Sequence, residues 1–163
     1  MVQQLHGFVY EDETVRVTFE GVAVVSVGRN CAESWSGADL SVVATISQPG
    51  RDDVRKAILL QSKRGRVEQL KTDEYERLLE QIEDMRALTR HTKVLEISTA
   101  KDGVPKVVSA SGLIQKRKLQ HQNFGDWIAK RVIPTFDGDT RPDFIRGVLD
   151  ARLSQLRVHA RKK

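Results

Sequence analysis

Asp39, Gln61 and Lys63 have residue types and a spacing suited to chemistry on a phosphodiester. Asp39 opens one apolar stretch, and Gln61 and Lys63 end the next. Because strand side chains alternate between two faces, Gln61 and Lys63 share a face, and a neighbouring strand would bring Asp39 beside them. Carboxylate and amide oxygens suit Mg²⁺, and a lysine can position a water and offset negative charge. The pattern therefore predicts a site for metal-assisted hydrolysis of a phosphodiester.

Two short motifs carry a resemblance to a known family. Gly37-Ala38-Asp39 places an acid at the start of a strand, and Gln61-Ser62-Lys63 ends a second, apolar strand. A helical segment then follows with the spacing Leu78, Gln81 and Met85. This combination resembles the PD-(D/E)xK superfamily of nucleases, which includes many restriction endonucleases, and more closely its bacterial restriction-like members with a QxK motif. The resemblance covers roughly residues 11–110.

The resemblance implies a restriction-endonuclease-like α/β core with a mixed central sheet flanked by helices. It implies that Asp39 is the principal metal ligand and that Gln61 is a second ligand or positions water. The backbone carbonyl of Ser62 would also coordinate the metal, and Lys63 would orient water and stabilise charge. Gln81 is a candidate contributor from the helix. The implied cofactor is Mg²⁺, with Mn²⁺ as a substitute.

Two questions about the site stay open: which residue supplies a third acid, and whether a site with the neutral Gln61 is catalytic. The family often has an acid on a preceding helix, for which Glu13 and Glu33 compete. An amide brings no negative charge to a cation, so Gln61 contributes less than a carboxylate would. A catalytically degenerate module of the same fold, which binds nucleic acid or recruits a partner, is therefore the alternative to a nuclease.

The charge distribution favours a polyanionic partner. The net charge is +5, and residues 114–163 carry 12 Lys and Arg against 5 Asp and Glu. A basic region of this kind suits nucleic acid, and we expect DNA. The candidate contacts to nucleic acid are Arg64, Arg66, Lys116, Arg117 and Lys118. An ordinary solvated surface with a basic tail is the alternative interpretation of these charges.

Composition narrows the class of protein. A chain of 163 residues with 39% hydrophobic and 30% charged residues suits one soluble domain. The single cysteine, Cys31, rules out an intramolecular disulfide and a cysteine-based zinc site. The four histidines are too scattered for metal-ligand spacing. We expect a cytoplasmic protein without a targeting or membrane segment, and the family suggests a homodimer or a larger complex in defence against phage or plasmids.

Hydrophobic periodicity predicts the elements that position these residues. Strands are expected at 40–47, 56–61, 93–98 and 104–109, and the clearest helix at 72–89. Residues 11–28 combine an acidic start with β-branched residues, and we favour a helix there. Helices are also expected at 124–133 and 142–157. The order predicts an α/β class and a single domain, 1–163, with a basic helical C-terminal part from about residue 114.

Overall fold

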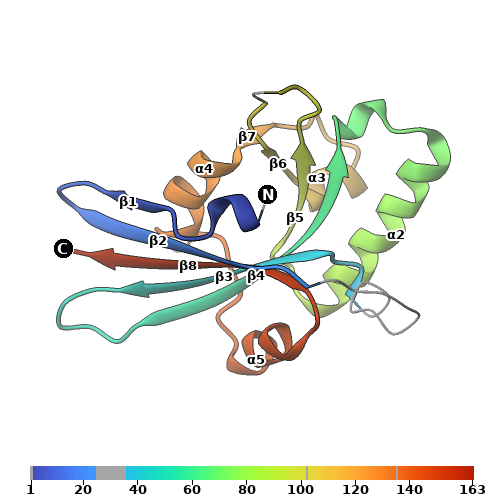
Figure 1. Ribbon diagram of the computed structural model, residues 1–163. Helices are drawn as coiled ribbons and strands as arrows, with labels where there is room; N and C mark the ends of the chain where they lie inside the picture. The colour runs from blue at the N-terminus through green and yellow to red at the C-terminus, as the bar shows by residue number, and fades with distance from the viewer. Residues whose placement is uncertain (1, 25–35, 102, 135) are drawn as a thin grey trace.

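A computed structural model describes residues 2–24, 36–101, 103–134 and 136–163. Helices flank one mixed sheet, whose strand order is β1-β2-β8-β3-β4-β5-β6-β7 (Figure 1). The strands are β1 (Val9–Glu11), β2 (Val15–Val22), β3 (Leu40–Ser47), β4 (Val54–Arg64), β5 (Thr92–Ile97), β6 (Lys106–Ser109), β7 (Gln122–Asn123) and β8 (Ser154–Lys162). The helices are α2 (Thr72–Leu88), α3 (Ala110–Ile114), α4 (Phe124–Trp127) and α5 (Pro142–Asp150), and the short turns of helix are η1 (Gln3–Leu5), η2 (Val67–Gln69) and η3 (Ile128–Val132).

The segment from β3 to β5 determines which strand ends meet. β3 and β4 form an antiparallel hairpin in which Leu40 pairs with Leu60. Helix α2 then carries the chain across, so that β5 lies parallel to β4 with Glu96 beside Lys63. The start of β3 therefore lies at the same edge of the sheet as the ends of β4 and β5.

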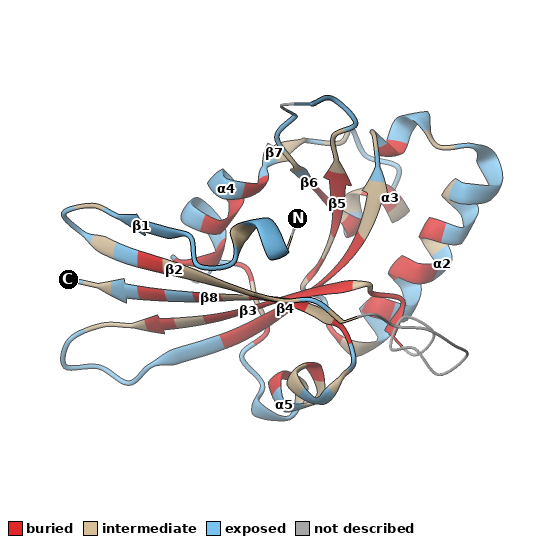
Figure 2. Ribbon diagram, in the orientation of Figure 1, coloured by how far each residue is buried: buried red, intermediate tan, exposed pale blue. Residues whose placement is uncertain are grey.

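Two hydrophobic clusters cover the two faces of the sheet, and Figure 2 shows the buried residues concentrated in its central strands. On one face, side chains such as Ile58 and Leu60 pack with Trp127 of α4. On the other face, side chains such as Leu59 pack with Ile82 of α2 and with α5. Because side chains alternate along β4, Gln61 and Lys63 lie on the face that α2 covers.

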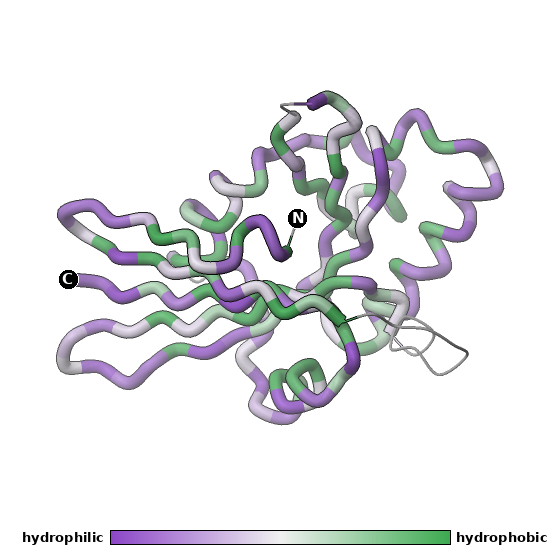
Figure 3. The backbone as a smooth tube through the Cα atoms, viewed as in Figure 1, coloured by the Kyte–Doolittle hydropathy of each residue, from purple (hydrophilic) through white to green (hydrophobic). Residues whose placement is uncertain are grey.

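The amphipathic pattern of the central segment is confirmed. Strands at 40–47 and 56–61 and a helix at 72–89 were expected, and β3, β4 and α2 occupy them. Hydrophobic and hydrophilic residues alternate along α2 (Figure 3), and the buried residues Leu78, Ile82 and Met85 form its inner face. A mixed sheet flanked by helices, in the α/β class, is therefore present.

One predicted helix is wrong and another is too long, at the opposite ends of the chain. Over the described residues 11–24, the favoured helix at 11–28 is instead strand β2 from Val15 to Val22, because its β-branched residues pair along the length of β8. The helix predicted at 142–157 ends at Asp150, and β8 follows it. The C-terminal part from about residue 114 therefore contains the helical segments α4, η3 and α5, but its last segment, β8, is a strand inside the sheet between β2 and β3.

The helices of the described residues have a further common property. None of them is both long enough and apolar enough to span a lipid bilayer.

Candidate active site

The carboxylate of Asp39 lies where β3 begins, against the end of β4. Its Oδ1 accepts a hydrogen bond from the Ser62 backbone N–H at 3.0 Å. Its Oδ2 accepts from the Ser62 hydroxyl at 2.6 Å and from the Gln61 side-chain amide at 3.1 Å. The Asp39 backbone N–H donates to the Leu60 carbonyl at 3.1 Å. The two sequence motifs are therefore in direct contact.

Gly37 explains how the chain delivers Asp39 to this position. Its φ of +67° lies in the left-handed region, which glycine adopts without a steric penalty. A Cβ on Gly37 would lie 2.2 Å from the Gln81 carbonyl oxygen, so the backbone passes directly against α2. The Ser36 hydroxyl accepts a hydrogen bond from the Ala38 N–H at 3.2 Å and stabilises the turn. Only glycine fits this close approach.

Lys63 and Gln81 form the part of the site that faces α2. The Lys63 ammonium donates a hydrogen bond to the Gln81 side-chain oxygen at 3.1 Å. Gln81 is buried on the inner face of α2, so its side chain holds the end of a flexible lysine in one place. The structure thus brings Gln81 together with the motif lysine.

Gln61 has the most informative environment in the site. Its side chain is 2% exposed, and its Oε1 has no hydrogen-bond partner among the described residues. A buried polar atom without a partner costs about 1–3 kcal/mol, so a ligand that satisfies it would be stabilised. Together with the Asp39 carboxylate, an amide oxygen supplies the ligand type that Mg²⁺ and Mn²⁺ accept. These donors therefore fit a hard divalent cation.

The predicted basic contacts are divided between two places. Arg64 and Arg66 are exposed and line a cavity next to Lys63, which Arg77 of α2 also lines. The basic residues 116–118 are exposed in the connection between α3 and β7 and do not line this cavity. The arginines that follow the Gln61-Ser62-Lys63 motif, rather than the later basic cluster, therefore adjoin the site.

Neither candidate for the third acid joins the site in the described residues. Glu13 is exposed in the turn between β1 and β2. Val15, at the start of β2, pairs with Lys162 at the end of β8, whereas Leu40 pairs with Ser154 at its beginning. Glu13 therefore lies at the end of the sheet opposite Asp39. Glu33 lies outside the described residues.

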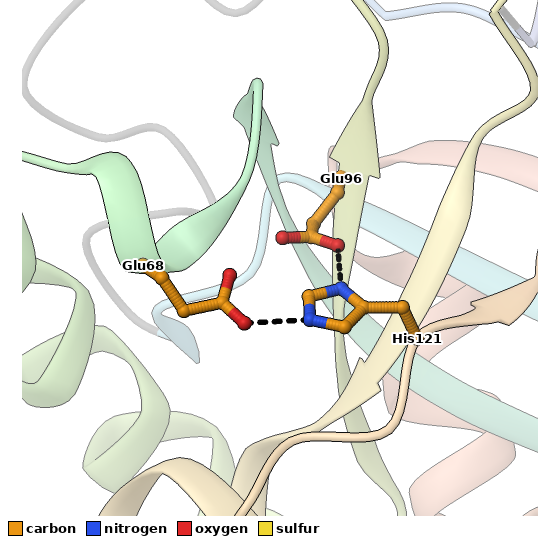
Figure 4. Close-up of side chains that lie close together, drawn as sticks. All are labelled: Glu68, Glu96 and His121. Atoms are coloured by element: carbon orange, nitrogen blue, oxygen red, sulfur yellow. Dashed lines mark hydrogen bonds and ion pairs between the residues drawn. The ribbon is translucent and has the colours of Figure 1, made fainter.

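A second polar cluster, which the sequence did not indicate, lies one strand away from the site. Glu96 of β5 accepts the Val67 N–H at 2.7 Å and contacts His121 Nδ1, while His121 Nε2 contacts Glu68 at 2.6 Å (Figure 4). One ligand atom from each of Glu68, Glu96 and His121 lies within 4.8 Å of the others.

The pKa of Glu68 reflects this cluster. Partial burial raises the pKa, but hydrogen bonds from its own backbone N–H and from His121, with the charge of Arg66, lower it below its ordinary value. The three residues are spread from position 68 to 121 and lie in η2, in β5 and in the loop before β7. A spacing pattern could not identify them, because the sheet register and the loop before β7 bring them together.

The geometry as a whole places three groups at one end of the central strands: an acid, a lysine, and a buried amide oxygen that has no partner among the described residues. These groups can bind a hard cation and stabilise negative charge on a phosphate. Comparisons of the chain with protein-family models, with curated proteins and with solved structures find no match.

Proposed function

We propose that the protein is a metal-dependent nuclease with a restriction-endonuclease-like core, which hydrolyses phosphodiester bonds in nucleic acid, with DNA as the expected substrate. The observation that carries the proposal is the contact of the Asp39 carboxylate with the side-chain amide of Gln61, whose buried Oε1 has no hydrogen-bond partner among the described residues. Lys63, two residues beyond Gln61 on the same face of β4, adds a cation that Gln81 holds in place.

The connection of the elements also supports the proposal. The resemblance requires an acid at the start of one strand, a neighbouring strand that ends in the second motif, and a following helix. β3, β4 and α2 have this order, and β3 pairs with β4 so that Leu40 lies opposite Leu60. The motifs that resemble the nuclease family are therefore in contact through the pairing of adjacent strands.

Each residue has a defined part in this proposal. Asp39 and Gln61 would hold the metal ion, with the Ser62 carbonyl as the further ligand that the family implies. The bound ion would stabilise charge on the phosphate and lower the pKa of a bound water. The Ser62 backbone N–H and hydroxyl fix the orientation of the Asp39 carboxylate. Lys63 would offset the negative charge that develops on the phosphate.

One observation favours a second candidate function. Three donors from Ser62 and Gln61 already satisfy the Asp39 carboxylate, and Gln61 adds no charge of its own. A metal ion would have to displace the Gln61 amide N–H and the Ser62 hydroxyl. If this exchange is unfavourable, the same fold would act as a non-catalytic module that binds nucleic acid or recruits a partner.

A cleavage assay separates the two candidates. Plasmid DNA, linear duplex, single-stranded DNA and RNA are incubated with the protein and millimolar Mg²⁺ or Mn²⁺. We expect the wild type to cleave, and Asp39→Asn and Lys63→Met to lose about 100-fold or more of the rate. Arg51→Glu, in the exposed turn at the far end of the β3–β4 hairpin, is the matched control and should cleave normally.

Metal binding gives a readout that does not depend on cleavage. Titration with Mn²⁺, followed by the electron paramagnetic resonance of the free ion, should show binding to the wild type and a loss of binding in Asp39→Asn. A wild type that cleaves no polymer with either metal contradicts the nuclease proposal. Nucleic acid binding without cleavage would then support the second candidate.

A further inference from the structure

A basic groove extends from the candidate active site across the end of the sheet. One cavity is lined by Lys63, Arg64, Arg77 and Gln81, and a second by Ser98, Lys106 and Asn123. The two cavities share the residues Gly65, Arg66, Gln69 and Thr99, so they are continuous. We call this feature the basic groove, and define it by the five cations Lys63, Arg64, Arg66, Arg77 and Lys106.

Three of the five cations in the basic groove are available to an anion. Within the described parts of the chain, Arg64, Arg77 and Lys106 take part in no ion pair. The two carboxylates that line the groove have local partners. Glu74 accepts the Lys71 backbone N–H at 3.3 Å, and Glu96 is engaged by Val67 and His121. The five cations therefore outnumber the groove's carboxylates, both of which accept hydrogen bonds from this chain.

The position of Arg66 depends on the second polar cluster. Its guanidinium Nη2 lies 3.4 Å from His121 Nε2, and its Nε lies 3.8 Å from Glu68 Oε2. Glu96 in turn accepts the backbone N–H of Val67, the next residue. Because Arg66 lines both cavities, the cluster of Glu68, Glu96 and His121 positions the residue at the middle of the groove. This gives the cluster a structural role that needs no metal ion.

The lining of the groove also indicates what it recognises. Of the residues that the structure describes, those lining the two cavities include no aromatic side chain. Base stacking on aromatic rings is the usual means of holding unpaired bases. Cations and small polar groups instead contact phosphates, which carry no sequence information. The chemistry of the groove is therefore that of a contact with the nucleic acid backbone.

We propose that the basic groove binds the phosphate backbone of duplex DNA without sequence preference, and holds phosphates that neighbour the one at Asp39 and Lys63. The identity of the ligand rests on the proposed function. Arg64, Arg77 and Lys106 each neutralise a phosphate, and they bind the polymer along a path from β4 over β5 to β6. Arg77, on α2, and Lys106, on β6, extend the contact beyond the motif that opens the groove.

Binding without cleavage tests the groove. Fluorescence anisotropy is measured with two labelled duplexes of unrelated sequence, in EDTA and separately in Ca²⁺, across a range of salt concentrations. Binding that releases counterions makes the logarithm of the association constant fall linearly with the logarithm of salt concentration, with a slope of about −0.9 for each phosphate contact on duplex DNA. We expect equal affinity of the wild type for both duplexes.

The variants Arg64→Gln, Arg77→Gln and Lys106→Gln should each weaken binding about fivefold to tenfold at roughly 0.1 M salt and reduce the salt slope by about one. Arg51→Gln removes an equally exposed arginine at the far end of the β3–β4 hairpin and should change neither quantity. Thermal unfolding of each variant checks that it is folded.

Three results would contradict the proposal that the groove binds DNA: no binding to DNA in either condition, groove variants that bind as the wild type does, or a strong preference for one duplex. Tighter binding of single-stranded DNA or RNA in the same assay would overturn the choice of duplex as ligand. Asp39→Asn distinguishes this proposal from the proposed function, because in EDTA it should bind DNA at least as tightly as the wild type does, while it fails to cleave with Mg²⁺ or Mn²⁺. If the wild type binds DNA through the groove but never cleaves it, the proposal for the groove is supported and the proposed nuclease function is contradicted.

Discussion

Two buried polar residues of strand β4, Lys56 and Gln61, have different surroundings. Lys56 is 1% exposed and Gln61 is 2% exposed, and among the described residues neither the Lys56 Nζ nor the Gln61 Oε1 has a hydrogen-bond partner. Because side chains alternate along a strand, they project to opposite faces of the sheet, and they lie towards opposite ends of β4. The two residues therefore allow a comparison, within one strand, of what surrounds a buried polar atom that has no hydrogen-bond partner among the described residues.

At the end of β4 that holds Lys56, the segment of Gly138 and Asp139 covers the side chain. The backbone of Asp139 pairs with Ala57 through two hydrogen bonds, at 2.9 and 3.0 Å. A Cβ on Gly138 would lie 2.5 Å from Lys56 Cδ, so this segment packs directly on the lysine. Burial, together with the repulsion from Lys162, lowers the pKa of Lys56 to about 8, although the attraction to Asp137 raises it.

The end that holds Gln61 gathers other chemical groups instead. Asp39 contacts the amide, and Lys63 adjoins the basic groove. Under the proposed function, what distinguishes Gln61 is that a carboxylate contacts its amide and that the neighbouring Lys63 lines a cavity. At Lys56, where Asp137 attracts the ammonium but the Gly138 segment packs on the side chain, burial is a cost to stability.

The largest expected effect is that of Gly37→Ala, which displaces Asp39 from Gln61. The new Cβ meets the Gln81 backbone at a strained φ, so we expect a loss of about 1–3 kcal/mol in stability and of about 100-fold in cleavage. Gly50→Ala is the matched control, with a φ of +72° but open space around its Cβ. Denaturant unfolding and cleavage rates of both variants check this. Equal activity of the two would show that the close approach to α2 does not position Asp39.

Next is Gln61→Glu, which places a second carboxylate against Asp39. Without metal, repulsion between the two should lower stability by about 1–2 kcal/mol. With Mg²⁺ or Mn²⁺, the added charge should raise metal affinity about tenfold, because these cations prefer carboxylate oxygens. Melting temperatures with and without each metal measure both effects. An unchanged metal affinity would mean that position 61 does not contact the ion.

Lys56→Met should stabilise the protein by about 1–3 kcal/mol at pH 7, because it removes a buried charge. The folded pKa of about 8 lies below the ordinary 10.5. Between these values the unfolded chain binds the proton and the folded chain does not, so wild-type stability should rise with pH. The variant should lose this rise, while Lys118→Met, at an exposed position, should keep it. Urea unfolding from pH 7 to 10 measures these differences. The cleavage rate of Lys56→Met should equal that of the wild type.

The smallest expected effect is that of Asp139→Asn, at the Lys56 end of β4. Burial raises the pKa of Asp139, but hydrogen bonds from Arg141 and Thr89 lower it well below its ordinary 3.8. Its contribution to stability is therefore present above about pH 4 and is lost as the pH falls. The variant should lose about 1 kcal/mol at pH 7 and show a shallower acid dependence of unfolding. If the variant loses cleavage but not stability, the Lys56 end of β4 contributes to the candidate site, and the contrast between the two ends does not hold.

Much of the central segment was predictable because its signals are local. The alternation in β3 and the spacing of Leu78, Ile82 and Met85 arise from neighbouring residues, whose pattern determines which face is buried. The same alternation predicts that Gln61 and Lys63 share a face. Contact of Asp39 with Gln61 followed from the pairing of adjacent strands, which is the simplest arrangement of a hairpin.

The tertiary structure alone decided the remainder. Residues 154–157 fit a helix continued from α5 as well as a strand, and the pairing of β8 with β2 and β3, more than 100 residues away, selects the strand. The partnership of His121 with Glu68 and Glu96, and the closure of Lys56 by Asp139, likewise depend on register and packing between distant segments. Local sequence determines the period and the polar groups of each element, but the free energy that selects the partner of each strand comes from long-range burial and pairing.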